Sequence, residues 1–329
     1  MEKLRVAFVG NWHVHGRDFA GKLQAMPDCE VTVYCGARRE WAKELSCRYE
    51  TDYGKVLQDQ EVDAVLLACS TADHEEMIIQ AANAGKHVFI EKALAVSNKA
   101  AYAIQNAVEK NNICFTMSDP VMKAPQMFAK RLVEEGKLGE ITNMRVRCTH
   151  DQAYQGKVNA QFFETEQSGG GAMIDTGCKA VHILYQFLGC PLRADAMFHS
   201  YSPLAQEKQV EDNAVAIYQF PNGAIGVAEC GWYSPKYQLS MDISGTKGCI
   251  CQRDDQIFYH LEDTEWIQVK PEELPPAQTY PLNEWVDSIR RGKRSEKYGI
   301  EEAVCLTEMI TAAYEAAGTI ATLVRKKDD

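Results

Sequence analysis

The residues best suited to chemistry in this sequence are one lysine and three polar residues that share a predicted helix face. Asp175, Lys179 and His182 are spaced i, i+4 and i+7, so they lie on one side of a helix, directly after the glycine run at 169–171. Lys92 follows an apolar, strand-like run. Oxidation of a secondary alcohol needs a base for the hydroxyl proton, and an ammonium group can stabilise the alkoxide charge that develops. These residue types indicate alcohol–ketone chemistry, although an Asp–Lys surface pair beside a core histidine would show the same spacing.

The loop after the first predicted strand, residues 10–16 (GNWHVHG), is a candidate for dinucleotide binding. Ligands of an open parallel sheet bind at the carboxyl ends of its strands. The dinucleotide fingerprint is G-x-G-x-x-G, but only Gly10 is present here, and Trp12 and His15 stand in place of the second and third glycines. Taken alone, the loop fits an ordinary strand–helix turn equally well.

Two pairs of residues have a spacing that suggests a metal site. His13 and His15 are one residue apart, but no carboxylate or cysteine accompanies them locally. Cys249 and Cys251 lack the second pair, or the histidines, that a zinc site needs. We therefore predict no metal site.

The end of the second predicted strand bears on the choice of dinucleotide. An NAD site usually has Asp or Glu there for the ribose hydroxyls. In this sequence that position falls on Gly36, and Arg38 and Arg39 follow. A guanidinium group can bind a 2′-phosphate through two hydrogen bonds. The sequence therefore mildly favours NADP over NAD, unless the two arginines are solvated residues of the next helix.

The elements that must position these residues alternate over the first 120 residues. Short apolar runs alternate with segments of helical period, which is typical of βαβ units and of a parallel sheet covered on both faces. Residues 1–120 are therefore predicted to form a doubly wound, NAD(P)-binding Rossmann domain. We expect strands at 4–10, 30–35, 62–69, 87–90 and 113–117, and helices at 15–26, 41–49, 73–84 and 99–109.

The pattern changes after residue 120. Segments of period two, separated by turn signals, run from 193 to 269 and indicate an antiparallel sheet. We assign residues 121–329 to a C-terminal α+β domain with a large, mainly antiparallel, open-faced sheet for substrate binding and oligomerisation. Its helices are expected at 124–135, 173–188, 282–291 and 300–324.

Several short motifs follow one another in an order and spacing that resemble the Gfo/Idh/MocA (glucose–fructose oxidoreductase/inositol dehydrogenase) family, over about residues 4–324. They are VDAV at 62–65 with STADH at 70–74, AGKHVFIEK at 84–92, GKLGEI at 136–141, GGGAMIDTG at 169–177, EDNAV at 211–215 with NGA at 222–224, and GTKG at 245–248.

This resemblance implies an oxidoreductase that binds NAD or NADP in its first domain. A hydride would move between the nicotinamide and a secondary alcohol or ketone of a sugar, glycoside or cyclitol, held between that domain and the open sheet face. Lys92 matches the lysine of the family's E-K-P motif, and Asp175 matches the aspartate of its D-x-x-x-H motif. His13 is expected on the nicotinamide side. The expected cofactor contacts are Gly10, Asn11, Trp12, His13, Val14, Arg38, Cys69, Ser70, His74, Glu91 and Lys92.

The sequence departs from the family's pattern at the expected catalytic residues. Ala93 replaces the proline of E-K-P, so the loop after Lys92 is less preset. Lys179 stands where many members have the catalytic histidine, and His182 comes one turn later. An imidazole, with a pKa near 6.5, shuttles protons easily, whereas a lysine near 10.4 needs its pKa lowered. Either Lys179 or His182, oriented by Asp175, is expected to exchange the hydroxyl proton.

Charge and cysteine usage exclude several other classes of protein. Lys and Arg number 35 against 46 Asp and Glu, a net charge of −11, which disfavours nucleic-acid and anionic-membrane partners. No apolar run approaches the ~20 residues of a membrane span, and the N-terminus enters a strand-like run without the apolar segment of a signal peptide. Most cysteines, such as Cys69, Cys114 and Cys305, lie among apolar residues. This pattern predicts reduced, buried thiols in a cytoplasmic protein.

Two other functions compete with the dehydrogenase. One is a glycosidase or lyase that uses tightly bound NAD to oxidise a sugar carbon transiently. The other is a non-catalytic nucleotide or sugar sensor, which the incomplete glycine motif favours and the presence of Lys92 and Asp175 opposes.

The predicted sheet also suggests contacts beyond the reacting groups. The period-two segments 215–220 and 224–230 leave a second sheet face to be covered, so we expect a homodimer or homotetramer. Trp232 and Tyr233 could stack on a sugar ring, or could belong to the core or to a subunit contact.

Overall fold

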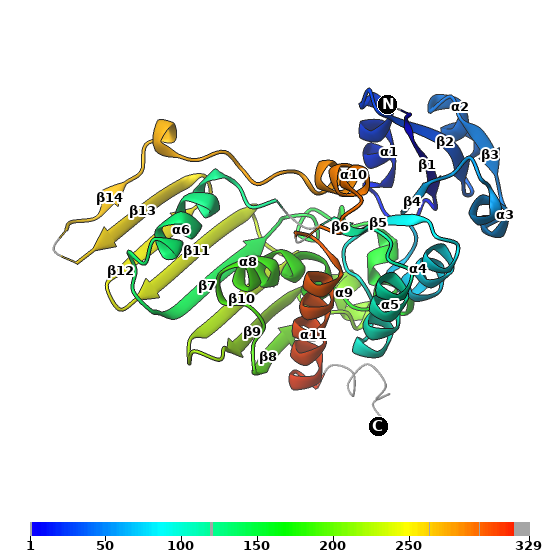
Figure 1. The fold of residues 1–329 in the computed structure, drawn as a ribbon. Coiled ribbons are helices and arrows are strands. Elements are labelled where there is room, and N and C mark those ends of the chain that lie inside the picture. The colour runs from blue at the N-terminus through cyan, green and yellow to red at the C-terminus, as the bar shows by residue number, and fades with distance from the viewer. Residues whose placement is uncertain (1, 119–120, 263, 296, 319–329) are drawn as a thin grey trace. The chain divides into compact units, whose positions relative to one another are not determined.

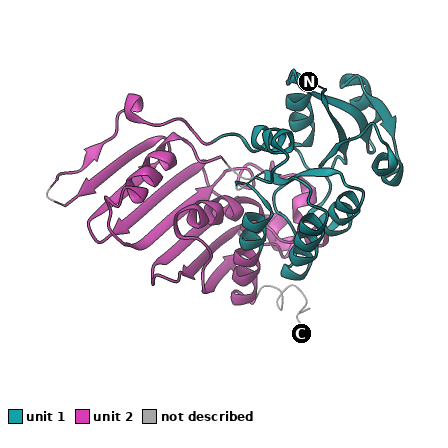
Figure 2. Cartoon of the chain, in the orientation of Figure 1, with its two compact units in different colours: residues 1–119, 279–307 teal, residues 120–278, 308–329 magenta. Residues whose placement is uncertain are grey.

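The computed structural model describes residues 2–118, 121–262, 264–295 and 297–318. The chain forms two compact units, which Figure 2 colours separately. Unit 1 comprises residues 1–119 and 279–307, and unit 2 comprises residues 120–278 and 308–329. This division differs from the predicted one, because residues 279–307 cluster with the N-terminal residues and not with the large sheet.

Unit 1 is built on a parallel sheet of six strands in the order β3-β2-β1-β4-β5-β6, as a doubly wound dinucleotide-binding fold requires. The predicted parallel sheet is confirmed. Its strands are β1 (Leu4–Val9), β2 (Cys29–Cys35), β3 (Arg48–Glu50), β4 (Ala64–Leu67), β5 (His87–Glu91) and β6 (Phe115–Ser118).

The helix predicted over 41–49 is wrong in its second half. Helix α2 (Arg39–Glu44) ends early, since Ser46 takes a positive φ of 55°, and the chain then enters strand β3. Tyr49 fixes this strand, because its hydroxyl donates to Gly36 O at 3.1 Å and its ring stacks on that of Tyr34. Tertiary contacts therefore override the local helical pattern.

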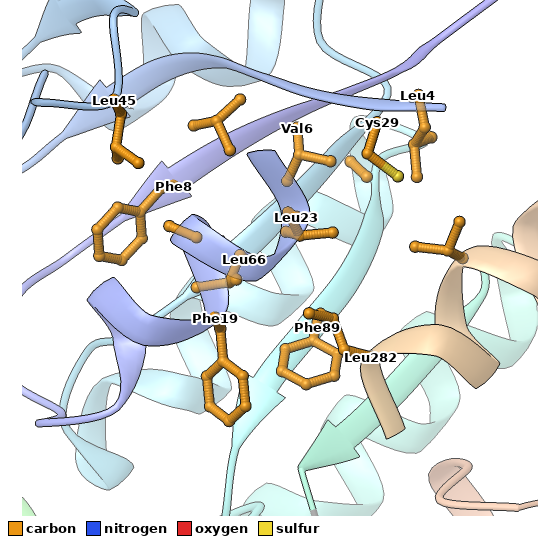
Figure 3. Close-up of a cluster of buried hydrophobic side chains, with 14 of the residues drawn as sticks. Leu4, Val6, Phe8, Phe19, Leu23, Cys29, Leu45, Leu66, Phe89 and Leu282 are labelled. Carbon is orange, nitrogen blue, oxygen red and sulfur yellow. The ribbon is translucent and has the colours of Figure 1, made fainter. Parts of the chain in front are cut away.

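The core of unit 1 explains why residues 279–307 belong to it. Phe8, Phe19 and Phe89 pack between the sheet and its helices, and Leu282 joins the same cluster (Figure 3). The indole of Trp285, which is fully buried, donates to Cys114 O at 3.4 Å. Helix α10 thus covers part of the parallel sheet. The unit's helices are α1 (Gly16–Ala25), α2, α3 (Tyr53–Gln58), α4 (His74–Asn83), α5 (Asn98–Lys110) and α10 (Pro281–Arg291), with the short helix η1 (Thr71–Asp73).

Unit 2 contains an eight-stranded sheet in the order β14-β13-β12-β11-β7-β10-β9-β8. All neighbouring pairs are antiparallel except β7 and β10, so the prediction of a mainly antiparallel sheet is confirmed. Strand β7 was not predicted, yet it lies in the middle of the sheet. The strands are β7 (Ile141–Thr149), β8 (Arg193–His199), β9 (Asn213–Gln219), β10 (Ile225–Gly231), β11 (Gln238–Gly245), β12 (Gly248–Arg253), β13 (Gln256–Leu261) and β14 (Ile267–Gln268).

Helices α6 and α8 lie over one face of the large sheet, as Figure 1 shows. The helix predicted over 173–188 begins as one π-helical stretch, η3, and continues as α8. The helix predicted over 300–324 ends at Ala316, and residues beyond 318 lie outside the described part of the chain. The remaining helices are α6 (Ala124–Glu134), η2 (Ala160–Phe163), α7 (Thr165–Ser168), η3 (Met173–Gly177), α8 (Cys178–Leu188), α9 (Pro203–Lys208), η4 (Pro271–Glu273) and α11 (Ile300–Ala316).

The cysteines follow the prediction with two exceptions. Ten of them are free thiols, and most of these are buried. Cys190 and Cys305 are disulfide-bonded, so the prediction of free thiols is wrong for these two. Among the described residues, no helix is both long and apolar enough to cross a membrane.

Candidate active site

The loop after β1 is fixed against the end of β4 in unit 1. The backbone N–H groups of Trp12 and His13 both donate to Ala68 O, at 2.9 and 3.1 Å. Gly10 has a φ of +91°, and a Cβ at this position would lie 2.9 Å from the backbone of Ala68. Only glycine permits this approach, so Gly10 makes the tight turn that the first glycine of a dinucleotide-binding loop makes.

Gly16, the first residue of α1, provides close packing between the helix and the sheet. A Cβ on Gly16 would lie 2.4 Å from the Cβ of Ala68 and 3.1 Å from the ring of Phe8. This is the role of the third glycine in the fingerprint. The fingerprint spacing places the third glycine at His15, but the glycine that takes this role is Gly16, one residue later. The spacing Gly10-x5-Gly16 was the signal available.

The end of β2 disfavours the acidic residue that usually binds the ribose of NAD. A Cβ on Gly36 would lie 2.5 Å from the hydroxyl of Tyr34, a fully buried side chain. The backbone N–H of Arg38 donates to that hydroxyl at 3.1 Å and holds it in place. The side chain of Arg38 is 60% exposed and lies 3.7 Å from Glu40. A guanidinium group therefore stands where solvent and ligands can reach it.

Lys92 directly follows β5, beside a buried carboxyl group. Oε2 of Glu91 accepts a hydrogen bond from the backbone N–H of Lys92 at 2.7 Å, and Oε1 lies 3.7 Å from Nδ1 of His13. The side chains of Glu91 and His13 are both buried. Two of the predicted cofactor residues thus fix the backbone and the surroundings of Lys92.

His74, at the start of α4, holds the chain that follows Lys92. Its Nδ1 lies 2.9 Å from Ala93 O and 3.0 Å from Leu94 O, so it donates to these carbonyl groups. The ring is buried, and its Nε2 has no hydrogen-bond partner among the described residues. Burial lowers the pKa of His74 to about 4. The imidazole is therefore neutral and carries its proton on Nδ1.

His74 should make stability depend on pH. The unfolded chain binds a proton near pH 6.5 and the folded chain only near pH 4, so the free energy of unfolding should fall as pH falls through this window. One pKa unit corresponds to ~1.4 kcal/mol, and the window therefore amounts to roughly 3 kcal/mol. The interval from pH 7 to pH 5 covers part of this window, so urea titrations at these two pH values should show a loss of about 2 kcal/mol in wild type and in the exposed control His199→Gln, but not in His74→Gln. An equal loss in all three would show that other groups carry it.

In unit 2, the glycine run 169–171 allows the side chain of Tyr314 and the backbone of Glu211 to approach the start of η3. Gly170 has a φ of +156°, and a Cβ there would lie 2.0 Å from the hydroxyl of Tyr314. A Cβ on Gly171 would lie 2.1 Å from the backbone oxygen of Glu211. Both glycines are thus required by close contacts.

Glu211 satisfies the N–H groups that the start of this helix leaves unpaired. Its Oε1 accepts hydrogen bonds from the backbone N–H groups of Gly171 (2.9 Å) and Met173 (3.0 Å) and from the hydroxyl of Tyr314 (2.5 Å). Burial raises the pKa of the Glu211 carboxyl, and these three hydrogen bonds oppose the rise. Glu211 and Tyr314 therefore set the position of the helix that carries Asp175.

Asp175 is oriented by a tryptophan. Its Oδ2 accepts a hydrogen bond from the indole N–H of Trp232 at 2.9 Å and from the hydroxyl of Thr176 at 3.2 Å. His150 lies 3.2 Å from the same hydroxyl through its Nε2 and stacks on Trp232. Trp232 is fully buried, so of the predicted alternatives it takes the core position, with its polar end on the candidate catalytic carboxylate.

The other two residues of the predicted helix face differ in exposure. Lys179 is half-buried, as is Asp175, whereas His182 is completely buried. A group that exchanges a proton with a substrate must be reachable by it. The exposure of these side chains therefore favours Lys179 over His182.

Comparison with known proteins identifies the two units. Residues 4–118 match the model of an oxidoreductase family with an NAD-binding Rossmann fold, and residues 127–251 match the GFO/IDH/MocA C-terminal domain. The chain belongs to the Gfo/Idh/MocA family of oxidoreductases. The predicted family, fold class and enzyme class are thereby confirmed, and unit 1 contains the NAD-binding Rossmann domain.

Relatives within the Gfo/Idh/MocA family are distant in sequence. Levoglucosan dehydrogenase of Pseudarthrobacter phenanthrenivorans is 24% identical over 77% of this chain and 74% of its own length. The scyllo-inositol 2-dehydrogenase (NAD(+)) of Bacillus subtilis is 27% identical over 65% of this chain and 62% of its own length. A solved structure of levoglucosan dehydrogenase with NADH and levoglucosan has a TM-score of 0.81 at 20% identity, covering 96% of this chain and 98% of that chain. The fold is therefore that of these dehydrogenases.

Unit 1 of this Gfo/Idh/MocA protein brings the predicted cofactor residues to one edge of its sheet. At Gly10 and Gly16 a Cβ atom would collide with neighbouring atoms, and glycines at such positions are typical of a dinucleotide-binding loop. Asp175, Lys179 and His182 lie together on η3 and α8 of unit 2. The carboxyl ends of four strands carry the predicted residues: Gly10, Asn11, Trp12, His13 and Val14 after β1, Arg38 after β2, Cys69, Ser70 and His74 after β4, and Glu91 and Lys92 at β5.

Substitution of Gly171 tests the packing around the glycine run. Gly171→Ala forces a Cβ against the backbone of Glu211, so we expect the free energy of unfolding to fall by about 1–3 kcal/mol. Turnover should also fall, because the shift displaces the helix of Asp175. The control is Gly21→Ala in α1, where nothing lies near the added Cβ and the exchange should be neutral or stabilising. Chemical denaturation of both variants measures the effect, and equal stabilities would contradict the close contact at Gly171.

Proposed function

We propose that this protein is an NAD(P)-dependent dehydrogenase or reductase that transfers a hydride between the nicotinamide and a secondary alcohol or ketone of a sugar, glycoside or cyclitol. The observation that carries the proposal is Lys92 at the carboxyl end of β5, fixed by Glu91 and by the chain that His74 holds. Relatives in the family are named for such substrates, including levoglucosan, scyllo-inositol and 1,5-anhydro-D-fructose.

In this proposal the side chains of the protein manage charge and protons. The bound cofactor supplies the hydride acceptor or donor. The ammonium group of Lys92 stabilises the negative charge that develops on the substrate oxygen. Lys179 exchanges the hydroxyl proton, and Asp175, oriented by Trp232, provides a carboxylate one helical turn away. His182, being completely buried, serves packing.

The substrate class is tested by dehydrogenase assays over sugars, keto-sugars, glycosides and cyclitols with each cofactor. Formation of NADH or NADPH with the alcohols, or its consumption with the keto-sugars, in proportion to product supports the proposal. A second candidate function is transient oxidation of a sugar carbon during hydrolysis or elimination. A relative named 2,7-anhydro-N-acetylneuraminate hydratase supports this second candidate. Turnover without any net change in the oxidation state of the cofactor would identify that reaction. If no member of the panel is turned over with either cofactor, both candidates are contradicted.

For the cofactor we propose a mild preference for NADP over NAD. The clash at Gly36 disfavours an acidic residue there, and the exposed Arg38 suits a 2′-phosphate. The same assays give kcat/KM for both cofactors, and a clear preference for NAD would contradict this choice. We also propose a cytoplasmic location, which the ten free thiols support.

We further propose a homodimer or homotetramer that covers the open face of the large sheet. Apolar side chains on β8, β9 and β10 point outward there: Met197, Val215, Ile217 and Ile225 are all exposed. Contiguous exposed apolar surface of this kind is typical of subunit contacts. Light scattering should give at least twice the chain mass of 36.9 kDa. A monomer at micromolar concentration would contradict the proposal, and Ile217→Lys should weaken the association.

A further inference from the structure

Three tyrosines form an exposed aromatic surface in unit 2, which we call the tyrosine platform: Tyr154, Tyr201 and Tyr233. Their exposed fractions are 57%, 56% and 37%. The rings of Tyr201 and Tyr233 stack with centroids 6.2 Å apart and an interplanar angle of 11°. The ring of Tyr154 lies 5.5 Å from that of Tyr233 at 59°. Clustered aromatic rings that remain exposed are typical of a binding surface.

The hydroxyl groups of the platform are available as well as its rings. None of the three hydroxyls hydrogen-bonds to another residue in the part of the chain that the structure describes. A tyrosine offers both an apolar ring and a hydroxyl that donates and accepts. The platform therefore suits a ligand that has an apolar face and a rim of hydroxyl groups, which is the chemistry of a sugar ring.

The platform is built on the backbone that also orients Asp175. Tyr233 directly follows Trp232, whose indole N–H donates to Asp175 at 2.9 Å. The segments that carry Tyr154 and Tyr233 are joined by three backbone hydrogen bonds, from His150 N to Gly231 O, from Ala153 N to Trp232 O and from Ser234 N to His150 O. A ring seated on the platform would therefore have a defined position relative to the candidate catalytic carboxylate.

We propose that the tyrosine platform is a subsite for the second ring of a glycoside, either a second sugar or an aglycone, whose first ring reacts beside Asp175. The inference rests on the proposed dehydrogenase function and narrows its substrate class from sugars and cyclitols to two-ring glycosides. The platform consists of only three side chains, so its area suits a single ring and is too small for an interface with another protein.

The test compares one-ring and two-ring probes on wild type and variants. The probes are glucose, methyl β-glucoside, phenyl β-glucoside and cellobiose, with kcat/KM from cofactor reduction and binding from saturation-transfer NMR. Wild type should prefer the two-ring probes by about tenfold, and Tyr233→Ala and Tyr201→Ala should remove that preference mainly through KM. Tyr233→Phe should keep most of it. The exposed control Trp266→Ala should resemble wild type.

The outcomes separate this inference from the proposed function. Binding of phenyl β-glucoside through the tyrosines without cofactor reduction would support the subsite and contradict the dehydrogenase. Equal kcat/KM for one-ring and two-ring probes, equal losses on both in the variants, or no binding of any probe would overturn the subsite. Dissociation of an oligomer by Tyr233→Ala would also overturn it, because the platform would then be a subunit contact.

Discussion

Replacement of Lys92 by alanine is expected to lower turnover by at least ~10²-fold, the usual effect of removing a group that stabilises charge in the transition state. The backbone N–H of Lys92 is fixed by Glu91, and the following carbonyl groups are fixed by His74. The side chain therefore extends from a rigid support at the edge where the cofactor is expected. Steady-state kinetics with the best substrate from the panel measures the effect.

Cofactor affinity should change far less than turnover in Lys92→Ala, because the backbone contacts of the loop remain. The exposed lysine at position 99, in α5, is a matched control, and Lys99→Ala should keep the wild-type rate. Near-wild-type turnover in Lys92→Ala would remove Lys92 from the mechanism. A lowered Tm in Lys92→Ala would instead indicate a structural defect. Lys92→Arg, which retains the charge, would then separate the loss of charge from the structural defect.

Replacement of Lys179 by methionine should also lower turnover by at least ~10²-fold, the scale of a general acid or base. Lys179 is half-buried on the helix that carries Asp175, whereas His182 is completely buried. Because a base must lose its proton before it acts, kcat/KM for oxidation should rise with pH in wild type and lose that dependence in Lys179→Met. His182→Gln should keep the pH profile and reduce stability instead.

Other outcomes for the two variants would assign the proton transfer to a different group. If His182→Gln removes the pH dependence and Lys179→Met keeps it, the buried imidazole is the proton acceptor and becomes reachable during turnover. If both variants keep the wild-type rate and profile, the helix face is structural. The proton would then go to Lys92 or to water.

Apolar patterning was enough to predict the sheet of unit 1. Strand β4 is buried on both faces and so appears in the sequence as a continuous apolar run. Strand β3 has only three residues at the sheet edge, and its pairing with β2 depends on the ring and hydroxyl of Tyr49. A short edge strand held by one side chain leaves no periodic signal.

Strand β7 was not predicted, for a different reason. Residues 144–148 alternate between buried and half-buried, but the partners of the strand, β10 and β11, come much later in the chain. Pairing over such a separation is decided by the whole sheet and not by the local pattern. The same holds for residues 279–307, whose Trp285 and Leu282 find their apolar contacts in the Rossmann core.

The sequence by itself determined the family, the parallel sheet and the candidate residues Lys92, Asp175, Lys179 and His182, because each of these depends on local spacing or on the order of motifs. Only the tertiary structure decided how these residues are supported. Helical spacing places Asp175 and His182 on one face, but it does not say what packs over that face. The structure buries His182, directs the indole of Trp232 to Asp175, and seats the carboxyl group of Glu211 under the glycine run. Burial and hydrogen-bond partners come from segments distant in sequence, so spacing along the chain could not reveal them.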